Sequence, residues 1–202
     1  MDENVKKRNE VLAQTVINGL QSRNMSGYYA EDKEAALKQA LELIAMGGCH
    51  SAQEIGLVEA LKEGNYNYID RSKMTPREGL LASYDADVFL SSANAMTSDG
   101  ILVNIDGNSN RVSCIAQGPK KVIFIVGMNK VCSDLDSAMK RARNIAAPTN
   151  AQNFDVKTPC KTTGKCFDCK SPDTLCCQFL ITRYSRHVGR IHVILVNDTL
   201  GY

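Results

Sequence analysis

Residues 120–126, Lys-Lys-Val-Ile-Phe-Ile-Val, form the most apolar strand that the sequence predicts. All residues from 122 to 126 are β-branched or aromatic, and a continuous apolar run of this length is typical of a strand buried on both faces of a sheet. Two similar runs predict further core strands at residues 88–90, Val-Phe-Leu, and 190–196, Arg-Ile-His-Val-Ile-Leu-Val. We expect these three stretches to form the centre of the fold.

Segments with helical patterns lie between the predicted strands. Apolar spacing and capping signals predict helices over residues 2–24, 31–46, 51–63, 75–84 and 133–146. Shorter strands are predicted at residues 27–30, 66–69 and 101–105. Pro148 is expected to end the last helix, because proline lacks the backbone N–H that a helix interior needs. The alternation of strands and helices predicts an α/β fold with a mainly parallel sheet flanked by helices.

The composition predicts a single domain spanning residues 1–202. The contents of hydrophobic residues, 44%, and of charged residues, 23%, are ordinary for a globular protein. A formal net charge of +2 gives no reason to expect binding to nucleic acid or to a membrane surface. Because the first 23 residues lack the apolar stretch of a signal peptide, we expect a cytoplasmic protein.

Five of the eight cysteines fall within residues 159–177, Pro-Cys-Lys-Thr-Thr-Gly-Lys-Cys-Phe-Asp-Cys-Lys-Ser-Pro-Asp-Thr-Leu-Cys-Cys. Short loops allow four thiols to converge on one metal centre. The expected ligands are Cys160, Cys166, Cys169 and Cys176. The alternatives are a 4Fe–4S cluster, a structural zinc ion, and a surface loop of reduced thiols or disulfides. Cysteines in a reducing compartment favour metal binding, and we place iron–sulfur ahead of zinc.

The cysteine run is predicted to contain neither helix nor strand, because Gly164, Pro172 and the Ser-Pro-Asp turn interrupt it. Packing alone would then not order it. Cys176 and Cys177 are adjacent, so their side chains point in opposite directions if the chain is extended. We expect Cys176 to be the ligand and Cys177 to be a core residue of the following strand.

A glycine pair precedes the helix predicted from residue 51. Gly47 and Gly48 allow backbone N–H groups to face a phosphate or carboxylate at the positive end of that helix. Ser51 and Glu54 form a capping box that fixes the start of the helix. These four residues are therefore candidates for binding an anion, although a glycine-rich connection without a ligand explains them equally well.

A polar region follows the strand predicted at residues 88–90, and in parallel sheets ligands bind beyond the carboxyl ends of strands. Arg111 is expected to bind an anion, and Asp99 or Asp106 to act as a general base, so these three are the candidate catalytic residues. The candidate ligand-orienting residues are Asn94, Thr97, Asn104 and Asn110. Turn formation explains the glycines here but not Arg111 or the many amides, so we favour a small-molecule site.

Motifs spread over nearly the whole chain resemble one protein family. They are Ala86-Asp87-Val88-Phe89-Leu90, Asn94-Ala95, Asp99-Gly100-Ile101-Leu102-Val103-Asn104-Ile105-Asp106-Gly107, Asn110-Arg111-Val112, Gly118-Pro119-Lys120-Lys121-Val122, Gly127 with Asn129-Lys130, Arg143-Asn144-Ile145-Ala146-Ala147-Pro148, Asn150-Ala151, the cysteine run and Leu200-Gly201-Tyr202. In these motifs the sequence resembles the single-domain, cysteine-bearing branch of the lactate-utilisation (LUD) domain family.

The resemblance implies a Rossmann-like α/β fold similar to ribose-5-phosphate isomerase and CoA transferases. It also implies association with the iron–sulfur machinery that oxidises L-lactate in bacteria, with iron–sulfur oxidoreductase subunits as partners. The family's glycine loop corresponds to Gly47-Gly48. Its central site corresponds to Asn94, Asp99, Asp106, Asn110 and Arg111.

Two functional hypotheses are left open. In the first, the chain is a lactate-utilisation-type redox accessory protein that binds an iron–sulfur cluster through its cysteines and an anionic small molecule in the α/β body. In the second, it is a stand-alone isomerase or transferase, or a binding module, for an anionic metabolite, with a structural zinc site. No G-x-G-x-x-G motif supports a nicotinamide site, and a homo-oligomer is compatible with both hypotheses.

Overall fold

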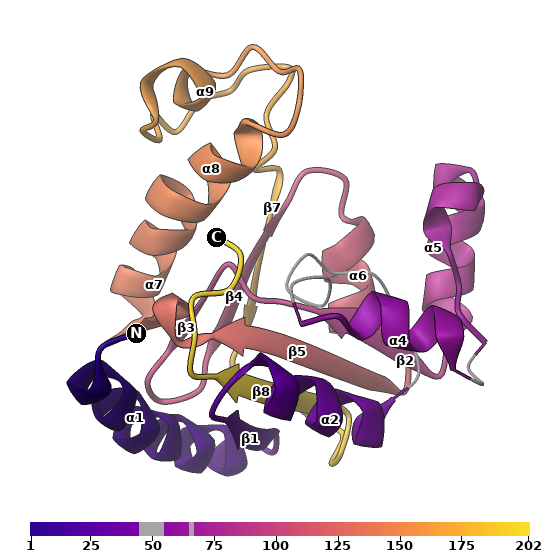
Figure 1. The fold of residues 1–202 in the computed structure, drawn as a ribbon. Helices are drawn as coiled ribbons and strands as arrows, with labels where there is room; N and C mark the ends of the chain where they lie inside the picture. The colour runs from indigo at the N-terminus through magenta and orange to yellow at the C-terminus, as the bar shows by residue number, and fades with distance from the viewer. Residues whose placement is uncertain (45–54, 65–66) are drawn as a thin grey trace.

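The centre of the fold is a four-stranded parallel sheet (Figure 1), in a computed structural model that describes residues 1–44, 55–64 and 67–202. Its strands are β1 (Ser26–Ala30), β2 (Val88–Ser91), β5 (Lys121–Gly127) and β8 (Ile191–Val196), in the order β1-β8-β5-β2. Every neighbouring pair is parallel. The predicted α/β fold is confirmed, and the three apolar runs are the three adjacent strands β8, β5 and β2.

Alternate residues of β5 point into separate cores on the two faces of the sheet. Phe124 packs in the core that contains α1 (Glu3–Ser22), whereas Ile123 and Ile125 pack in the core that contains α2 (Lys33–Leu43) and α4 (Leu57–Glu63). Because helices cover both faces, the central strands need apolar residues at every position, which explains their continuous apolar runs.

Two further helices each precede a strand of the parallel sheet in the chain, α5 before β2 and α6 before β5. α5 (Pro76–Asp85) begins at the predicted capping box, in which the Glu78 N–H donates to the Thr75 hydroxyl and the Thr75 N–H donates to the Glu78 carboxylate. α6 (Asn110–Ala116) occupies the segment after the polar turn. Short 3-10 turns lie at η1 (Arg71–Lys73) and η2 (Met128–Lys130). Residues 67–70 have no regular secondary structure. The strand predicted at residues 66–69 is therefore wrong for residues 67–69.

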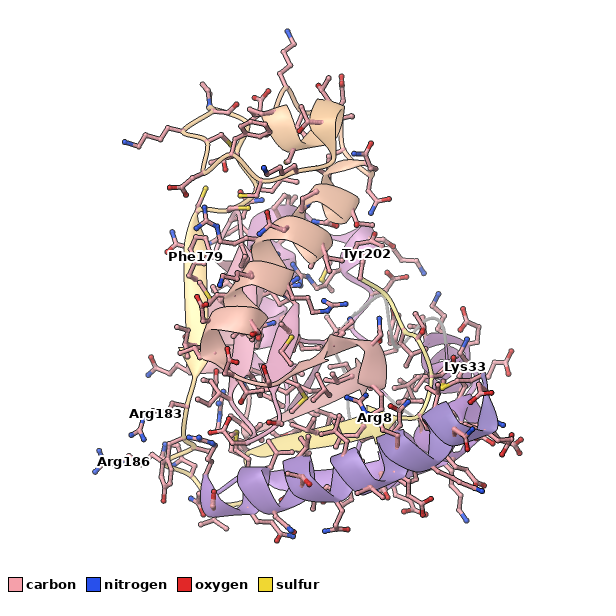
Figure 2. The ribbon with its side chains drawn as sticks, turned by 90° about the vertical axis from the view of Figure 1, so that its left-hand side faces the viewer. Arg8, Lys33, Phe179, Arg183, Arg186 and Tyr202 are labelled. Carbon is pink, nitrogen blue, oxygen red and sulfur yellow. The ribbon has the colours of Figure 1, made fainter. Side chains whose placement is uncertain are left out.

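A second, smaller sheet was not predicted. Its strands are β6 (Val131–Cys132), β3 (Ala95–Thr97), β4 (Leu102–Asp106) and β7 (Gln178–Thr182), in the order β6-β3-β4-β7. β4 is antiparallel to both β3 and β7, and β3 is parallel to β6. β7 runs along one edge of the molecule from Phe179 towards Arg183 (Figure 2), and it connects the cysteine run to β8.

One long helix passes through the proline that was expected to end it. α7 (Leu135–Arg141) continues through a π-helical turn, η3 (Ala142–Ala146), into α8 (Ala147–Ala151). Pro148 lies in the first turn of α8, directly after the widened π turn, where the missing N–H is tolerated. The N-cap of α7 is Asp134, so the helix begins two residues later than predicted, and the Asp134 carboxylate accepts from the Ser137 N–H at 2.8 Å.

The cysteine run lies beyond the end of α8, on the side of the molecule opposite α1 and α2 (Figure 1). It contains one short helix, α9 (Pro159–Thr163), so the prediction of no regular structure is wrong at this point. Pro159 occupies the first helical position, where its fixed φ is favourable, and Gly164 ends the helix with a φ of 70°. The rest of the run before β7 is loop.

None of the helices in the described parts of the chain combines the length and the apolar character that crossing a bilayer requires.

Candidate functional site

The four cysteines predicted as ligands line a single cavity of about 60 Å³. Cys160 comes from α9, Cys166 and Cys169 from the loop that follows, and Cys176 from the residues just before β7. We call this space the cysteine cavity. Its walls also include Arg143 and the apolar side chains Phe167, Leu175 and Phe179. The structure therefore brings together thiols that the sequence separates by up to sixteen positions.

The cavity thiols lie close enough to affect one another's ionisation. Burial, followed by the negative charges of Cys166, Cys160 and Cys169, raises the pKa of Cys176 to about 11, and the positive charge of Arg143 opposes this rise. All seven cysteines in the described parts of the chain are free thiols rather than disulfides. At neutral pH Cys176 therefore keeps its proton until a cation replaces it.

Cys177 does not belong to this set. Its side chain is exposed, its Sγ lies 3.6 Å from the Thr174 carbonyl oxygen, and it does not line the cavity. The expectation that Cys177 would be a core residue is wrong, because β7 is an edge strand with little protein covering it. Of the two adjacent cysteines, Cys176 is the one that lines the cavity, and its expected role as a ligand stays a prediction.

One hydrogen bond links the chain just before the cysteine run to a residue near the end of the run, and another attaches the end of the run to β4. The Lys157 N–H donates to the Asp173 carboxylate at 2.9 Å, and the Cys177 N–H donates to the Asp106 carbonyl oxygen at 3.0 Å. Thr158 is buried, with its hydroxyl 3.3 Å from the Cys160 sulfur. Within the described parts of the chain, no three His, Cys, Asp or Glu side chains are close enough together to hold one metal ion.

A second cavity, of about 370 Å³, adjoins the cysteine cavity. Ala147 and Leu175 line both cavities, so at this point the two cavities are separated only by these two residues. We call the second space the polar cavity. Its polar lining consists of Ser92, Asn94, Arg111, Lys130, Asn150, Asn153 and Tyr202. Two cationic side chains and three amides therefore face one cavity at the carboxyl ends of β2 and β5.

Arg111 is held in place by the residues around it. Its Nη2 donates to the Asn94 Oδ1 at 3.3 Å and to the Ile105 carbonyl oxygen, and its Nε lies 4.0 Å from the Asp106 carboxylate. The buried Nε has no hydrogen-bond partner among the described residues. A guanidinium fixed in this way, with donor capacity left, is suited to binding an anion.

Lys130 provides the second positive charge of the polar cavity. It lies in η2, immediately after β5, and only 2% of its surface is exposed. Its Nζ donates to the Ser92 hydroxyl at 3.0 Å. Lys130, Asn150 and Asn153 were not among the site residues predicted from the sequence. The signal for Lys130 was its position directly after the most apolar strand, where ligands of parallel sheets bind.

Asp106 and Asn110 have structural contacts around the start of α6. The Asp106 carboxylate accepts from the backbone N–H groups of Arg111 at 2.9 Å and Val112 at 3.1 Å, which fixes the start of the helix. The Asn110 carbonyl oxygen accepts from the Ser113 hydroxyl at 3.2 Å. Neither residue lines the polar cavity.

Asp99 lies away from Arg111, at the turn between β3 and β4. Its carboxylate accepts from the Thr97 hydroxyl and from Arg23 at the end of α1, and these contacts, Thr97 first, lower the pKa of Asp99. Asn104 is fully buried and donates to the Ser92 carbonyl oxygen at 2.9 Å. Asn94 and Arg111 are thus the predicted residues that the structure brings together in the polar cavity, and Asp99, Thr97 and Asn104 do not line it.

The predicted glycine cradle, comprising Gly47, Gly48, Ser51 and Glu54, lies outside the described residues.

Comparisons with known proteins agree with this fold. The family model described as the LUD domain matches residues 13–196. The chain is also similar to the crystal structure of a DUF162 family protein from Deinococcus radiodurans, with a TM-score of 0.50 and 13% sequence identity over 94% of this chain and 98% of that chain. At this identity the likeness concerns the fold alone. No curated protein matches the sequence.

Proposed function

The chain belongs to the LUD domain family, which is generally associated with lactate utilisation, and from this premise we propose that it is a cytoplasmic, bacterial redox accessory protein. In this proposal Cys160, Cys166, Cys169 and Cys176 bind a 4Fe–4S cluster, and the polar cavity binds an anionic small molecule. The expected partners are iron–sulfur oxidoreductase subunits. When bound, such a cluster supplies one-electron transfer.

The observation that carries the proposal is the convergence of four thiols on one cavity. Cys160 precedes the Cys166–Cys169 pair by six positions and Cys176 follows it by seven, yet all four line the same space. Surface thiols without a common role have no reason to converge, and Cys177 does not join them. Four cysteine thiolates are also the usual ligand set of 4Fe–4S clusters.

A cluster and a single zinc ion make different demands on the thiols. One zinc ion requires each sulfur at about 2.3 Å from one point, whereas a cluster accepts each thiolate on a different iron and so occupies a wider space. The cavity of about 60 Å³ exceeds the ~10–15 Å³ that one water molecule occupies, which supports the wider centre.

The protein's own contribution is a partly enclosed, apolar surrounding for the thiols. Phe167, Leu175 and Phe179 line the cavity, although Phe167 and Phe179 remain substantially exposed to solvent. The high pKa of Cys176 means that this thiol releases its proton only when a cation takes its place. Metal binding should therefore stabilise the thiolates and the loop that carries them.

The polar cavity supports the second half of the proposal. Arg111 and Lys130 supply positive charge, while Asn94, Asn150 and Asn153 supply donors and acceptors that can orient a small molecule. This combination fits a carboxylate or a phosphate. Because Ala147 and Leu175 line both cavities, such a ligand would lie directly beside the cysteine cavity.

The cluster is tested by purifying the protein without oxygen and measuring its visible spectrum together with its content of iron, sulfide and zinc. We expect broad absorbance near about 400 nm that dithionite bleaches, with iron and sulfide in similar amounts. A colourless protein with one zinc ion per chain would overturn the cluster and favour the alternative of an isomerase, transferase or binding module with structural zinc.

Two matched variants test which cysteines bind. Cys166→Ala should lose the chromophore, because it removes a cavity thiol, whereas Cys177→Ala should retain it, because that thiol lies outside the cavity. Loss of the chromophore in both variants to the same extent would contradict the ligand assignment.

The polar cavity is tested by titration calorimetry with L-lactate, pyruvate and inorganic phosphate. Arg111→Gln should weaken binding of whichever anion binds by about tenfold or more, because it removes a charge-assisted hydrogen bond. Arg183→Gln makes the same change on the exposed surface at the far end of β7 and should have no effect (Figure 2). Equal affinities for all three proteins would contradict this site.

A further inference from the structure

Arg143 reaches the cysteine cavity from the π-helical turn. Ala142 and Ala146, at the two ends of that turn, are fully buried, so the turn is fixed against the body of the protein. An isolated π turn places one extra residue in the helix and frequently marks a functional position. Arg141, two residues earlier, donates from Nε to the Asn129 carbonyl oxygen at 3.1 Å, whereas Arg143 turns to the thiols.

Two groups hold the guanidinium of Arg143. Its Nη2 lies 3.7 Å from the Cys166 sulfur and 2.6 Å from the Asp168 carboxylate. Its positive charge also acts on Cys176. Among the described residues that line the cysteine cavity, Arg143 is the only one with a positive charge. About a third of its side chain, 34%, is exposed, so solvent screens it incompletely.

We infer that Arg143 is a positioning residue that raises the reduction potential of the cluster proposed for the cysteine cavity, by donating to the Cys166 sulfur. This inference rests on the proposed function. Reduction adds one electron and therefore one negative charge to the cluster. A fixed cation hydrogen-bonded to a ligand sulfur stabilises the more negative, reduced form more than the oxidised form. Ligand hydrogen bonding is a general means of tuning a metal centre.

Asp168 opposes this effect, because its carboxylate competes with the Cys166 sulfur for the guanidinium and adds a negative charge nearby. Its carboxylate is highly exposed, and its backbone has a φ of 52°, which is uncommon for a residue other than glycine. Removing the Asp168 charge leaves Arg143 free to act on the sulfur alone and removes a nearby negative charge. Both consequences favour the reduced form. If the ion pair only held the loop in place, Arg143→Gln and Asp168→Asn would both weaken the loop. They would not shift the reduction potential in opposite directions.

The test is a redox titration of protein prepared without oxygen, with dithionite as reductant and visible absorbance and electron paramagnetic resonance as readouts. Arg143→Gln should make the one-electron reduction about tenfold less favourable, which corresponds to about 59 mV. Arg143→Lys keeps the charge but not the planar guanidinium, and its shift should be smaller. Asp168→Asn should shift the potential upwards, and Arg183→Gln, with the same loss of charge far from the cavity, should leave it unchanged.

The outcomes separate this inference from the function on which it rests. Wild-type protein without iron and sulfide would overturn both. An Arg143→Gln protein with wild-type iron, sulfide and potential would overturn the role of Arg143 alone. If Arg143→Gln fails to retain the cluster, Asp168→Asn and Arg143→Lys decide, and an Asp168→Asn potential that is unchanged or lowered would overturn the inference.

Discussion

The parallel sheet and the cysteine segment, residues 158–177, are stabilised in different ways. In β5 the five residues from 122 to 126 have no exposed surface, and helices pack on both sides of them. In the cysteine segment Thr158 alone is buried, and Phe167 is 58% exposed. Burial of apolar surface accounts for the sheet, whereas the segment has hydrogen bonds at its ends and an array of free thiols. The sheet and the proposed cluster site therefore lie in different parts of the molecule.

The largest difference between the two regions should appear when a phenylalanine is removed from each. Phe124→Ala deletes a fully buried side chain from β5 and should lower the free energy of unfolding by about 3–5 kcal/mol. Phe167→Ala removes a mostly exposed ring and should change it by less than about 0.5 kcal/mol. Urea denaturation followed by circular dichroism measures both. Similar losses would contradict the proposed contrast between the regions.

Glycine substitutions should show the same contrast with a smaller effect. At Gly19 in α1 an added Cβ would lie 2.5 Å from the Asp99 backbone, which cannot yield as a flexible side chain can. Gly19→Ala should therefore destabilise the protein by about 1–3 kcal/mol, despite the helix preference of alanine.

At Gly164 the outcome should depend on the backbone alone. An added Cβ meets nothing within 4 Å, so Gly164→Ala should cost only the ~1–2 kcal/mol of placing a side chain at a positive φ. Thermal denaturation of the two variants, each repeated after chelation of bound metal, distinguishes the steric clash at Gly19 from the backbone strain at Gly164. If Gly19→Ala is as stable as the wild type, the close approach of α1 to the β3–β4 turn is incorrect.

Removal of metal should loosen the cysteine segment and leave the sheet intact. After treatment with a chelator and an oxidant of the cluster, amides of residues 158–177 should exchange with solvent much faster, because of these residues Thr158 alone is buried. Amides of β5 and β8 should keep their protection. Hydrogen exchange with mass spectrometry gives both readings. Loss of protection in both regions together would show that they unfold as one unit.

The smallest expected effect concerns His192 in β8. The Tyr28 hydroxyl lies 3.0 Å from its Nδ1, the Gly189 carbonyl oxygen lies 2.8 Å from its Nε2, and burial lowers the pKa of the imidazole. Below its ordinary pKa of about 6.5, the unfolded chain binds a proton more readily than the folded chain. Stability should therefore fall as the pH is lowered from about 7.5 towards the depressed folded pKa.

A single substitution isolates this contribution. In His192→Gln the part of the pH dependence due to the imidazole should vanish, so the stability of the variant should change less between about pH 7.5 and pH 5. Denaturation midpoints at several pH values provide the measurement. A variant with the same slope as the wild type would assign the pH dependence to other groups.

The parallel sheet was predictable because burial on both faces leaves an unmistakable apolar pattern in residues 88–90, 120–126 and 190–196. The second sheet was not. β3 has only three residues, and β7 is an edge strand whose Phe179 and Ile181 are exposed, so neither carries that pattern. The helix through Pro148 was missed because its π turn has no local signature, and only there does proline become compatible with a continuing helix.

The candidate site was predictable where neighbours in sequence are neighbours in space. Spacing alone selected Cys160, Cys166, Cys169 and Cys176, which the structure places around one cavity. Arg143 could not be selected, because its distance to Cys166 depends on the π turn and on the path of a loop more than twenty residues later. Asn150 and Asn153 likewise reach the polar cavity only through the long helix.

Differential alkylation tests most directly whether one inorganic centre holds these four sulfurs. Protein purified without oxygen is treated with iodoacetamide before and after chelation, and each cysteine is quantified by mass spectrometry. We expect Cys177 to react from the start, because it is exposed, and the four cavity cysteines to react only after the metal is removed. Rapid modification of any of the four in iron-loaded protein, at the rate of Cys177, would contradict the account.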